Sequence, residues 1–595
     1  MNEPADTEFT LSAALEMHRA GQLQAAAEIY RQLHERDRSN HDACYGLGTV
    51  LMQQGEFESA LALLEQAVSA APNVPEYVYN RACVMQRLGR NQQAANGFIR
   101  AARLAETDPL MLVEICSGLT ALGHHYAAAN ILAAASQRVP RARIVWLAYA
   151  CSLGKIRDYK AAIVAHEHAL TIEPGCAADF LSYADLLFMA KRPAAARKAL
   201  DRARELGTDD PRARYLEARC ERFAGNRANE RRLLAEAIEL RPSYGDAWQF
   251  LLETTPDEEL PSLILNCRQL ADDQAAKPYD RIMLSYAAGR GLERLADYDA
   301  AFKQYESANQ RQRSDALSRG IRYDKAGNEQ FVERIRSQFA VRGSSATPTA
   351  PDVQPIFIVG MPRSGTTLVE RILGGLDGVV TGGESEALEL VAGQYYTALD
   401  RGQAKPIREL QPADWDELAR HYWRLQTEPE SRLTDKMPTN FRHVGMICSM
   451  FPDAPIVYVQ RDPRDVALSI FSRRFADGHP YATEFDSLAH YYAVSQQLMS
   501  HWKSLYPERI VDIGYEELVK GRKAETRRLA EFCGLVWQPE CLDFHERTDA
   551  SYTFSELQVR EPLNAKGIDR WRKYAEPLAP FVEACIAYGV HLRDN

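Results

Sequence analysis

A 34-residue period runs through the first part of the chain, up to about residue 245. Stepping by 34 gives a column of seven positions, five of which are glycine: Gly21, Gly55, Gly89, Gly123, Arg157, Lys191 and Gly225. Glycine most easily takes the left-handed conformation in which a helix ends and a turn begins. The residues around the column are rich in Ala, Leu, Glu, Arg and Gln, which favour helices. Each period is therefore expected to be one helix–turn–helix unit.

Small residues occupy fixed places on both sides of this turn. Seven positions before it stand Ala14, Gly48, Ala82, Cys116, Ala150, Ala184 and Ala218, and five positions after it Ala26, Ala60, Ala94, Ala128, Ala162, Ala196 and Glu230. Small side chains at matching places let the two helices of a unit approach closely. The pattern resembles the tetratricopeptide repeat (TPR), a 34-residue helix–turn–helix unit. That resemblance implies an all-α solenoid whose concave groove suits a peptide or another protein.

Period and composition divide the chain into four regions. Residues 8–245 are predicted to form a TPR solenoid of about seven repeats, and residues 246–342 a degenerate helical region. Residues 343–354 have the composition of a linker, rich in Ser, Thr and Pro. Residues 355–595 are a separate region, because a chain of 595 residues is too long for one core.

Short apolar runs in the last region alternate with helical stretches. Runs at residues 356–359, 379–380, 456–459 and 510–513 are interpreted as strands. The alternation is typical of a doubly wound α/β fold with a parallel sheet. In such folds ligands bind beyond the carboxyl ends of the strands. The residues that follow each strand are therefore the candidates for a site.

The first strand is followed by a glycine-bounded loop at residues 360–365 and then by a helix. This order points backbone N–H groups and a helix N-terminus at an anion, and a nucleotide phosphate is the natural ligand. Nucleoside-triphosphate loops have lysine where this chain has Thr366, which disfavours ATP chemistry. Arg363 supplies a guanidinium fork instead. The predicted phosphate-binding residues are Arg363, Ser364, Gly365, Thr366 and Thr367.

Two charged residues stand between this loop and the strand at residues 456–459. Glu384 ends a Thr-Gly-Gly-Glu stretch, where a carboxylate facing a phosphate loop can act as general base toward a hydroxyl. A solvated surface glutamate is the alternative from residue type alone. Lys436 can place its ammonium on a bridging oxygen as negative charge develops there.

The last two strands are followed by further candidates. Arg461 ends the strand at residues 456–459, and Ser469 lies on the helix that follows, so both can reach one phosphate. Arg473 flanks them, and Tyr515 follows the final strand. Two more motifs stand near the C-terminus: Ser555-Glu-Leu-Gln558 and Lys566-Gly567-Ile-Asp-Arg570-Trp571.

Together these motifs resemble those of sulfotransferases that use 3′-phosphoadenylyl sulfate (PAPS). The loop at residues 360–365 resembles the family's 5′-phosphosulfate loop, and Arg461 with Ser469 its 3′-phosphate site. Tyr515 resembles the aromatic residue beside the adenine, and the two C-terminal motifs resemble its lid. The resemblance covers about 240 residues and is closest to the tyrosylprotein type, which shares a glutamate twenty-one positions beyond the loop arginine.

The resemblance implies transfer of a sulfuryl group from PAPS to a hydroxyl acceptor, with 3′-phosphoadenosine 5′-phosphate (PAP) as product. It implies that Glu384 is the base and that Lys436, Arg363 and Ser555 stabilise the charge that grows on the donor. The implied donor-binding residues are Arg363, Ser364, Gly365, Thr366, Thr367, Arg461, Ser469, Arg473, Tyr515, Gln558 and Lys566. No metal is implied, because we find no carboxylate cluster suited to one.

The sequence departs from its relatives near the base. Glu386 and Leu390 stand where tyrosylprotein enzymes carry basic residues that grip acidic peptides. The Lys436-Met-Pro stretch lacks the histidine base of the cytosolic small-molecule enzymes, and His443 is interpreted as a packing or surface residue. The acceptor stays open among tyrosine, a sugar hydroxyl and a small alcohol.

Composition limits the partners and the compartment. A net charge of −10 argues against general nucleic-acid binding. Eleven scattered cysteines without Cys-x-x-Cys pairs do not look like a disulfide framework. The acidic N-terminus lacks a signal peptide, and no apolar run approaches the ~20 residues of a membrane span. These features predict a cytoplasmic protein with no membrane partner.

Three functions are weighed. The first is an active PAPS-dependent sulfotransferase that recruits a protein or peptide acceptor through its TPR groove. The second is a TPR scaffold whose sulfotransferase-like domain binds nucleotide without turnover. The third is a P-loop kinase, which Thr366 disfavours. The repeats could instead only support or dimerise the second half, and the oligomeric state stays open.

Overall fold

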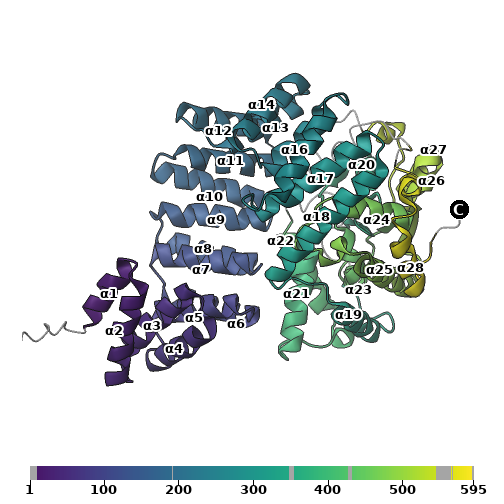
Figure 1. The fold of residues 1–595 in the computed structure, drawn as a ribbon. Helices are drawn as coiled ribbons and strands as arrows, with labels where there is room; N and C mark the ends of the chain where they lie inside the picture. The colour runs from purple at the N-terminus through teal and green to yellow at the C-terminus, as the bar shows by residue number, and fades with distance from the viewer. Residues whose placement is uncertain are drawn as a thin grey trace, which may run out of the picture. The chain divides into compact units, whose positions relative to one another are not determined.

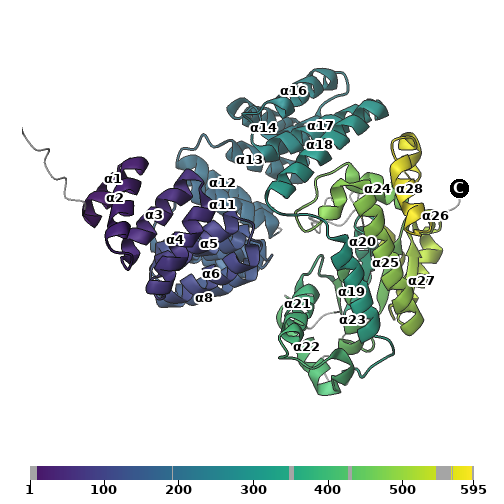
Figure 2. The same cartoon turned by 60° about the horizontal axis from the view of Figure 1, so that its bottom comes forward.

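The computed structural model describes residues 10–190, 192–346, 354–426, 432–544, 565 and 567–592. They divide into two compact units, one that ends at Asn226 and one that begins at Arg227 (Figures 1 and 2). The domain boundaries drawn from the sequence divide the chain differently and stay predictions.

The first unit consists of helices, which pair in sequence order as far as α12 (Figure 1). These helices are α1 (Leu11–Arg19), α2 (Leu23–Arg36), α3 (His41–Gln54), α4 (Phe57–Ala70), α5 (Pro75–Arg87), α6 (Asn91–Leu104), α7 (Pro109–Ala121), α8 (His125–Arg138), α9 (Arg143–Lys155), α10 (Tyr159–Ile172), α11 (Ala177–Met189), α12 (Pro193–Glu205) and α13 (Pro211–Phe223). This is the predicted array of helical repeats.

The described members of the glycine column lie in turns between consecutive helices. All five of its glycines have positive φ, with values from 74° at Gly89 to 86° at Gly55, and Arg157 follows them at 60°. The small residues before the turn, from Ala14 to Ala218, are all buried. The period therefore has two physical causes, a left-handed turn residue and a close approach of paired helices.

The second unit begins with more helices of the same kind. They are α14 (Arg227–Leu240), α15 (Gly245–Thr254), α16 (Leu260–Asp272), α17 (Pro278–Arg294), α18 (Tyr298–Ser318) and α19 (Lys325–Gln338). Helices α17 and α18 form a pair joined at Ala296, whose φ of 60° repeats the turn conformation of the first unit.

A five-stranded parallel sheet forms the centre of the second unit. Its strands are β1 (Ile356–Gly360), β2 (Val379–Thr381), β3 (Arg432–Asp435), β4 (Ile456–Gln460) and β5 (Ile510–Gly514), in the order β2-β3-β1-β4-β5. Every neighbouring pair is parallel. The predicted fold class, helical repeats followed by an α/β domain with a parallel sheet, is confirmed.

The helices between and after the strands surround this sheet. They are α20 (Thr366–Leu373), α21 (Ala387–Asp400), α22 (Pro412–Arg424), α23 (Val444–Met450), α24 (Pro463–Phe471), α25 (Phe485–Leu505), α26 (Tyr515–Lys520), α27 (Arg522–Phe532) and α28 (Ala579–Ala587). Short 3-10 helices include η2 (Pro438–His443), η3 (Pro480–Thr483) and η6 (Arg570–Tyr574).

Side chains of β1 alternate between two apolar cores. Ile356 and Ile358 belong to the core that includes α20 and α27, while Phe357 and Val359 belong to the core that includes α22, α23 and α25. Both faces of the strand are therefore buried, as its continuous apolar run predicts.

The four strands expected from the sequence are present, but a fifth was missed. Strand β3 lies between β2 and β1 and has the sequence Arg-Leu-Thr-Asp. Only Leu433 in it is apolar, although Leu433, Thr434 and Asp435 are all buried. Hydrogen bonds to the neighbouring strands, rather than an apolar run, make this segment a strand.

Neither a membrane-spanning helix nor a metal-binding cluster is found in the described part of the chain. No helix there is long and apolar enough to cross a bilayer. No group of three or more His, Cys, Asp or Glu side chains there could hold a metal ion.

Asp435 is a fully buried carboxyl at the end of β3. Tyr422 donates its hydroxyl to Oδ2 of Asp435 at 2.9 Å, and Asn440 donates Nδ2 to Oδ1 at 3.1 Å. Burial outweighs these bonds and raises the pKa of Asp435 from 3.8 to about 7. Between those two pH values the folded protein binds more protons than the unfolded chain. The contribution of Asp435 to the free energy of unfolding therefore falls as the pH rises.

An Asp435→Asn variant cannot ionise at this position. Its free energy of unfolding should therefore increase relative to that of the wild type as the pH rises. We expect the melting temperature of the variant, relative to that of the wild type, to increase from about pH 5 to about pH 8. Scanning calorimetry over this range measures the difference.

The matched control is Asp414→Asn. The pKa of Asp414 is lowered by a backbone hydrogen bond from Gln411 and by Lys405, so this carboxyl is ionised throughout the range. The difference in melting temperature between Asp414→Asn and the wild type should not change with pH. If the difference for Asp435→Asn were also independent of pH, the raised pKa of Asp435 would be contradicted.

Candidate active site

The five strands end at one edge of the sheet, and the candidate residues follow them there. The phosphate loop follows β1, Glu384 follows β2, Lys436 follows β3, Arg461 follows β4 and Tyr515 follows β5. The parallel topology makes this convergence unavoidable, because parallel strands place all their carboxyl ends together.

The loop between β1 and α20 has the conformation of an anion-binding turn. Gly360 has a φ of 153° and Gly365 a φ of 109°, and Arg363 between them takes a left-handed φ of 71°. A Cβ on Gly365 would lie 2.6 Å from the ring of Tyr515, so only glycine fits. The N-terminus of α20 begins at Thr366 directly behind the loop. Backbone N–H groups and the helix dipole therefore favour an anion here.

Polar side chains of the loop and of the first turn of α20 are buried, and one of them lacks a hydrogen-bond partner among the described residues. Ser364, Thr366 and Thr367 are all buried. The hydroxyl of Ser364 has no hydrogen-bond partner among the described residues. A buried hydroxyl without a partner is costly, and a ligand oxygen in the loop would remove that cost.

Arg461 lies against the loop rather than apart from it. Its Nη1 donates to the carbonyl of Arg363 at 3.2 Å, and its Nη2 donates to the carbonyl of Gly567. Its guanidinium lies over the ring of Tyr515, 4.6 Å from the centroid. Its buried Nε has no hydrogen-bond partner in the described chain.

Arg363 joins the loop to the helix after β4. Its Nε donates to Oγ of Ser469 at 3.0 Å, across 106 residues of sequence. The two predicted phosphate sites, at the loop and at Arg461 with Ser469, are therefore parts of one site.

Guanidinium groups gather behind this contact and repel one another. Burial, Arg461 and Arg570 lower the pKa of Arg363 to about 10. Burial, Arg363, Arg290 and Arg570 lower the pKa of Arg473 well below its ordinary value. A bound anion would relieve this repulsion, because opposite charge favours the charged form of each arginine.

Glu384 and Lys436 form an ion pair beside the loop. Nζ of Lys436 donates to Oε1 of Glu384 at 2.8 Å, and the lysine side chain is almost fully buried while 31% of the glutamate side chain is exposed. The negative charge of Glu384 also counters the lowering of the pKa of Arg363. A carboxylate open to solvent on one side and held by a buried ammonium on the other can receive a proton from an approaching hydroxyl.

The short backbone turn before Glu384 is fixed by neighbouring strands. Gly382 donates its N–H to the carbonyl of Thr434 at 3.0 Å, and Lys436 donates its N–H to the carbonyl of Gly383 at 2.9 Å. Gly383 has a φ of 72°, which suits glycine. His443, by contrast, is a buried residue whose Nε2 lies 2.7 Å from Oε2 of Glu389. We assign it no part in the site.

The structure thus gathers most of the predicted site residues. These are Arg363, Ser364, Gly365, Thr366, Thr367, Glu384, Lys436, Arg461, Ser469, Arg473 and Tyr515. Ser555, Gln558 and Lys566 lie outside the described residues. Their assignment stays a prediction.

Two further residues belong to the site but were not singled out as such in the sequence. Arg570 lowers the pKa of Arg363 and stands in the C-terminal motif that contains Gly567. Asp465 is buried, and its two carboxylate oxygens accept the N–H groups of Asp569 and Trp571 at 2.9 and 2.8 Å. In the sequence, the one indication that Asp465 belongs to the site is its position between Arg461 and Ser469.

Comparison with known proteins agrees with this geometry. A family model described as "Sulfotransferase family" matches residues 355–539, and one described as "Tetratricopeptide repeat" matches residues 17–80 and 157–220. The first match covers the sheet and the candidate residues from Arg363 to Tyr515.

Two relatives illustrate the similarity. An uncharacterized protein of Aquifex aeolicus (strain VF5) is 29% identical over 332 residues, which cover 53% of this chain and 42% of that protein. A protein-tyrosine sulfotransferase of Drosophila melanogaster is 25% identical over 243 residues, covering 36% of this chain and 46% of that protein. The chain spans less than half the length of these relatives.

A tetratricopeptide repeat protein from Parabacteroides merdae, known from its crystal structure, is 16% identical. The alignment covers 41% of this chain and 96% of that one, with a TM-score of 0.32, too low to bear on the fold. The family models thus find a sulfotransferase domain at residues 355–539 and tetratricopeptide repeats in the same chain.

Proposed function

We propose that this protein transfers the sulfuryl group of PAPS to a hydroxyl acceptor. The observation that carries the proposal is the meeting of two phosphate sites: Arg461 donates to the backbone of Arg363, and Arg363 donates to the side chain of Ser469. A donor with phosphates at both ends of an adenosine offers one phosphate to each part of the site, and Thr366 in the place of a lysine disfavours ATP.

The residues present fit such a donor. The loop at residues 360–365 offers backbone N–H groups and the buried Ser364 hydroxyl to one phosphate. Arg461 and Ser469 face a second phosphate, and the unpartnered Nε of Arg461 can donate to it. Tyr515 supplies an aromatic face beside Arg461 for the base. When bound, PAPS supplies the sulfuryl group.

The chain's own residues divide the remaining work. The carboxylate of Glu384 accepts the proton of the acceptor hydroxyl at Oε1 or Oε2. The buried ammonium of Lys436 holds that carboxylate in place and puts positive charge where negative charge grows. Arg363 adds a second cation at the same place. Sulfuryl transfer resembles phosphoryl transfer in its loose transition state, so positioning and charge should account for most of the rate.

The acceptor is proposed to be a protein or peptide that the TPR groove recruits. Support comes from the helical pairs of the first unit, since stacked repeats of this kind present extended concave binding surfaces. Glu386 and Leu390 offer no basic grip for an acidic peptide next to the base.

Replacing Arg461 with alanine should weaken PAP binding by roughly 10- to 100-fold, the usual cost of a charged hydrogen bond. Isothermal calorimetry with the full-length protein measures the affinity. The control is Arg420→Ala on α22, an exposed arginine of the same domain. Unchanged PAP affinity in Arg461→Ala would rule out the donor site.

Replacing Glu384 with glutamine should leave PAP affinity within about threefold, because the carboxylate contacts the acceptor and not the donor. Sulfuryl transfer should fall by about 10²- to 10⁴-fold, as for loss of a general base. The assay incubates each protein with sulfur-labelled PAPS and a cell lysate and counts the labelled product.

The matched control is Glu386→Gln, two residues along the same loop. If the Glu384→Gln variant transfers the sulfuryl group at the normal rate, Glu384 is not the general base. A wild-type protein that binds PAP and transfers nothing would favour the scaffold function instead.

A further inference from the structure

Helices α17 and α18, which belong to the helical region and not to the sulfotransferase-family match, hold the loop that carries Arg473. This loop follows α24. From α18, Nδ2 of Asn309 donates to the carbonyl of Phe471 at 2.7 Å, and Nε2 of Gln312 donates to the carbonyl of Phe475 at 2.6 Å. The two bonds stand on either side of Arg473.

Both amides are buried and fixed in orientation. Asn309 is 2% exposed and Gln312 is 7% exposed. The hydroxyl of Tyr286 on α17 lies 2.9 Å from Oδ1 of Asn309 and 3.3 Å from Oε1 of Gln312. The hydroxyl has one hydrogen, and the shorter contact shows that it goes to Oδ1 of Asn309, which keeps the NH₂ group of Asn309 turned toward the loop.

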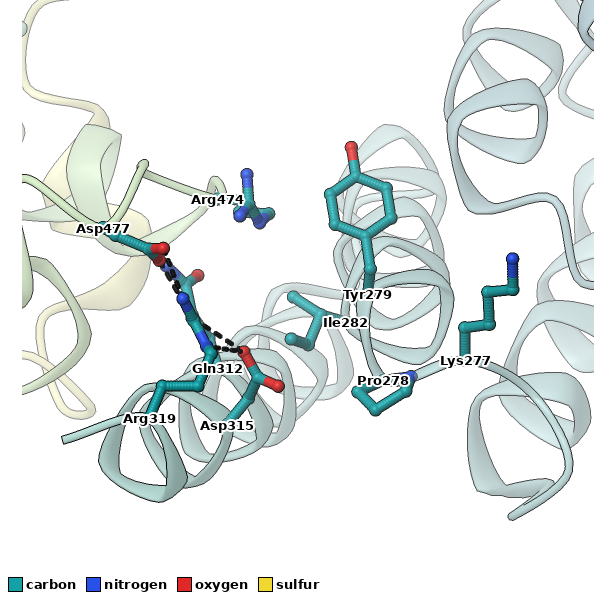
Figure 3. A pocket seen from close by; sticks show the side chains of 9 residues that line it. All are labelled: Lys277, Pro278, Tyr279, Ile282, Gln312, Asp315, Arg319, Arg474 and Asp477. Carbon is teal, nitrogen blue, oxygen red and sulfur yellow. Dashed lines mark hydrogen bonds and ion pairs between the residues drawn. The ribbon is translucent and has the colours of Figure 1, made fainter. Parts of the chain in front are cut away.

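Two outer contacts hold the same loop (Figure 3). The guanidinium of Arg474 lies over the ring of Tyr279, 4.8 Å from its centroid, and Nη2 of Arg319 donates to Oδ1 of Asp477 at 3.0 Å. Between these contacts is a cavity of about 300 Å³, and Gln312 is part of its lining. Space beside the loop means that polar bonds, rather than dense packing alone, set its position.

Helix α17 also reaches the arginine cluster directly. Glu293 accepts from Arg570 at both oxygens, from Nε at 2.7 Å and from Nη2 at 2.6 Å. Arg290, one turn earlier, is among the cations that lower the pKa of Arg473. Tyr305 of α18 donates to Oε2 of Glu293 at 2.9 Å, which ties the two helices together at this point.

Apolar packing makes α17–α18 a firm support. Tyr286, Phe302 and Tyr305 share a buried cluster with Leu468 and Phe471 of α24. The ring centroids of Phe302 and Phe471 are 5.5 Å apart, with the rings nearly parallel. The helix that carries Ser469 is thus packed on the same pair of helices that binds the loop after it.

We propose that α17–α18 is a wall of the donor site, in which Asn309 and Gln312 are positioning residues that hold Arg473 toward a phosphate of the donor. The inference rests on the proposed function, because it assigns Arg473 to the same nucleotide. It adds that donor affinity depends on side chains of the helical region, outside residues 355–539.

The test is a double-mutant cycle in the full-length protein, with Asn309→Leu and Arg473→Ala singly and together. Arg473→Ala alone should weaken PAP binding. Asn309→Leu should weaken PAP binding by about tenfold when Arg473 is present and by less than about twofold when it is absent. The loss of melting temperature caused by Asn309→Leu should be equal in both backgrounds. A purely structural role would give the same change of affinity in both backgrounds.

Two further variants keep the test decisive. Gln312→Met, at the cavity, removes the second bond with less disturbance of packing and should behave like Asn309→Leu if that variant fails to fold. Asn80→Leu removes a buried amide of the first unit that donates to Tyr45, so it should lower stability and leave PAP affinity unchanged.

The outcomes separate this inference from the proposed function. If Arg473→Ala weakens PAP binding while Asn309→Leu and Gln312→Met do not, the positioning role is overturned and the donor site stands. An equal loss of affinity in both backgrounds also overturns it. A wild-type protein with no PAP affinity overturns both proposals.

Discussion

Like charges crowded into one buried place are the constraint on which this site depends. Arg363, Arg461, Arg473 and Arg570 converge where burial already disfavours a charged group. Carboxylates compensate in part, through Glu293 on Arg570 and Glu384 on Lys436. The loop and the orphaned Ser364 hydroxyl complete a place that an anion with several oxygens would stabilise. Whatever the family, a buried excess of positive charge such as this favours an anionic ligand.

Holding such a cluster together requires support from distant parts of the chain. The parallel sheet supplies the common edge, and Asp465 ties the C-terminal segment to α24 through two backbone N–H groups. Helices α17 and α18 add amide donors on one side and Glu293 on the other. Two helices of the second unit that lie outside residues 355–539 therefore contact segments that carry candidate site residues.

Patterns over a few residues predicted those features of the fold that depend on nearby residues alone. The glycine column predicted the left-handed turns, and apolar runs predicted four strands. Strand β3 was missed because three of its four residues are polar. Asn309, Gln312 and Glu293 were missed because their partners lie more than 160 residues away, and no spacing in the sequence records such contacts. Ser555, Gln558 and Lys566 remain predictions that rest on resemblance.

The most direct measurement is a crystal structure of the protein grown with PAP. The account predicts one phosphate within hydrogen-bond distance of the backbone N–H groups of the loop at residues 360–365, and the other bonded to the guanidinium of Arg461 and the hydroxyl of Ser469. Density for PAP away from this loop, or with either phosphate in solvent, would contradict the claim that the arginine cluster is a donor site.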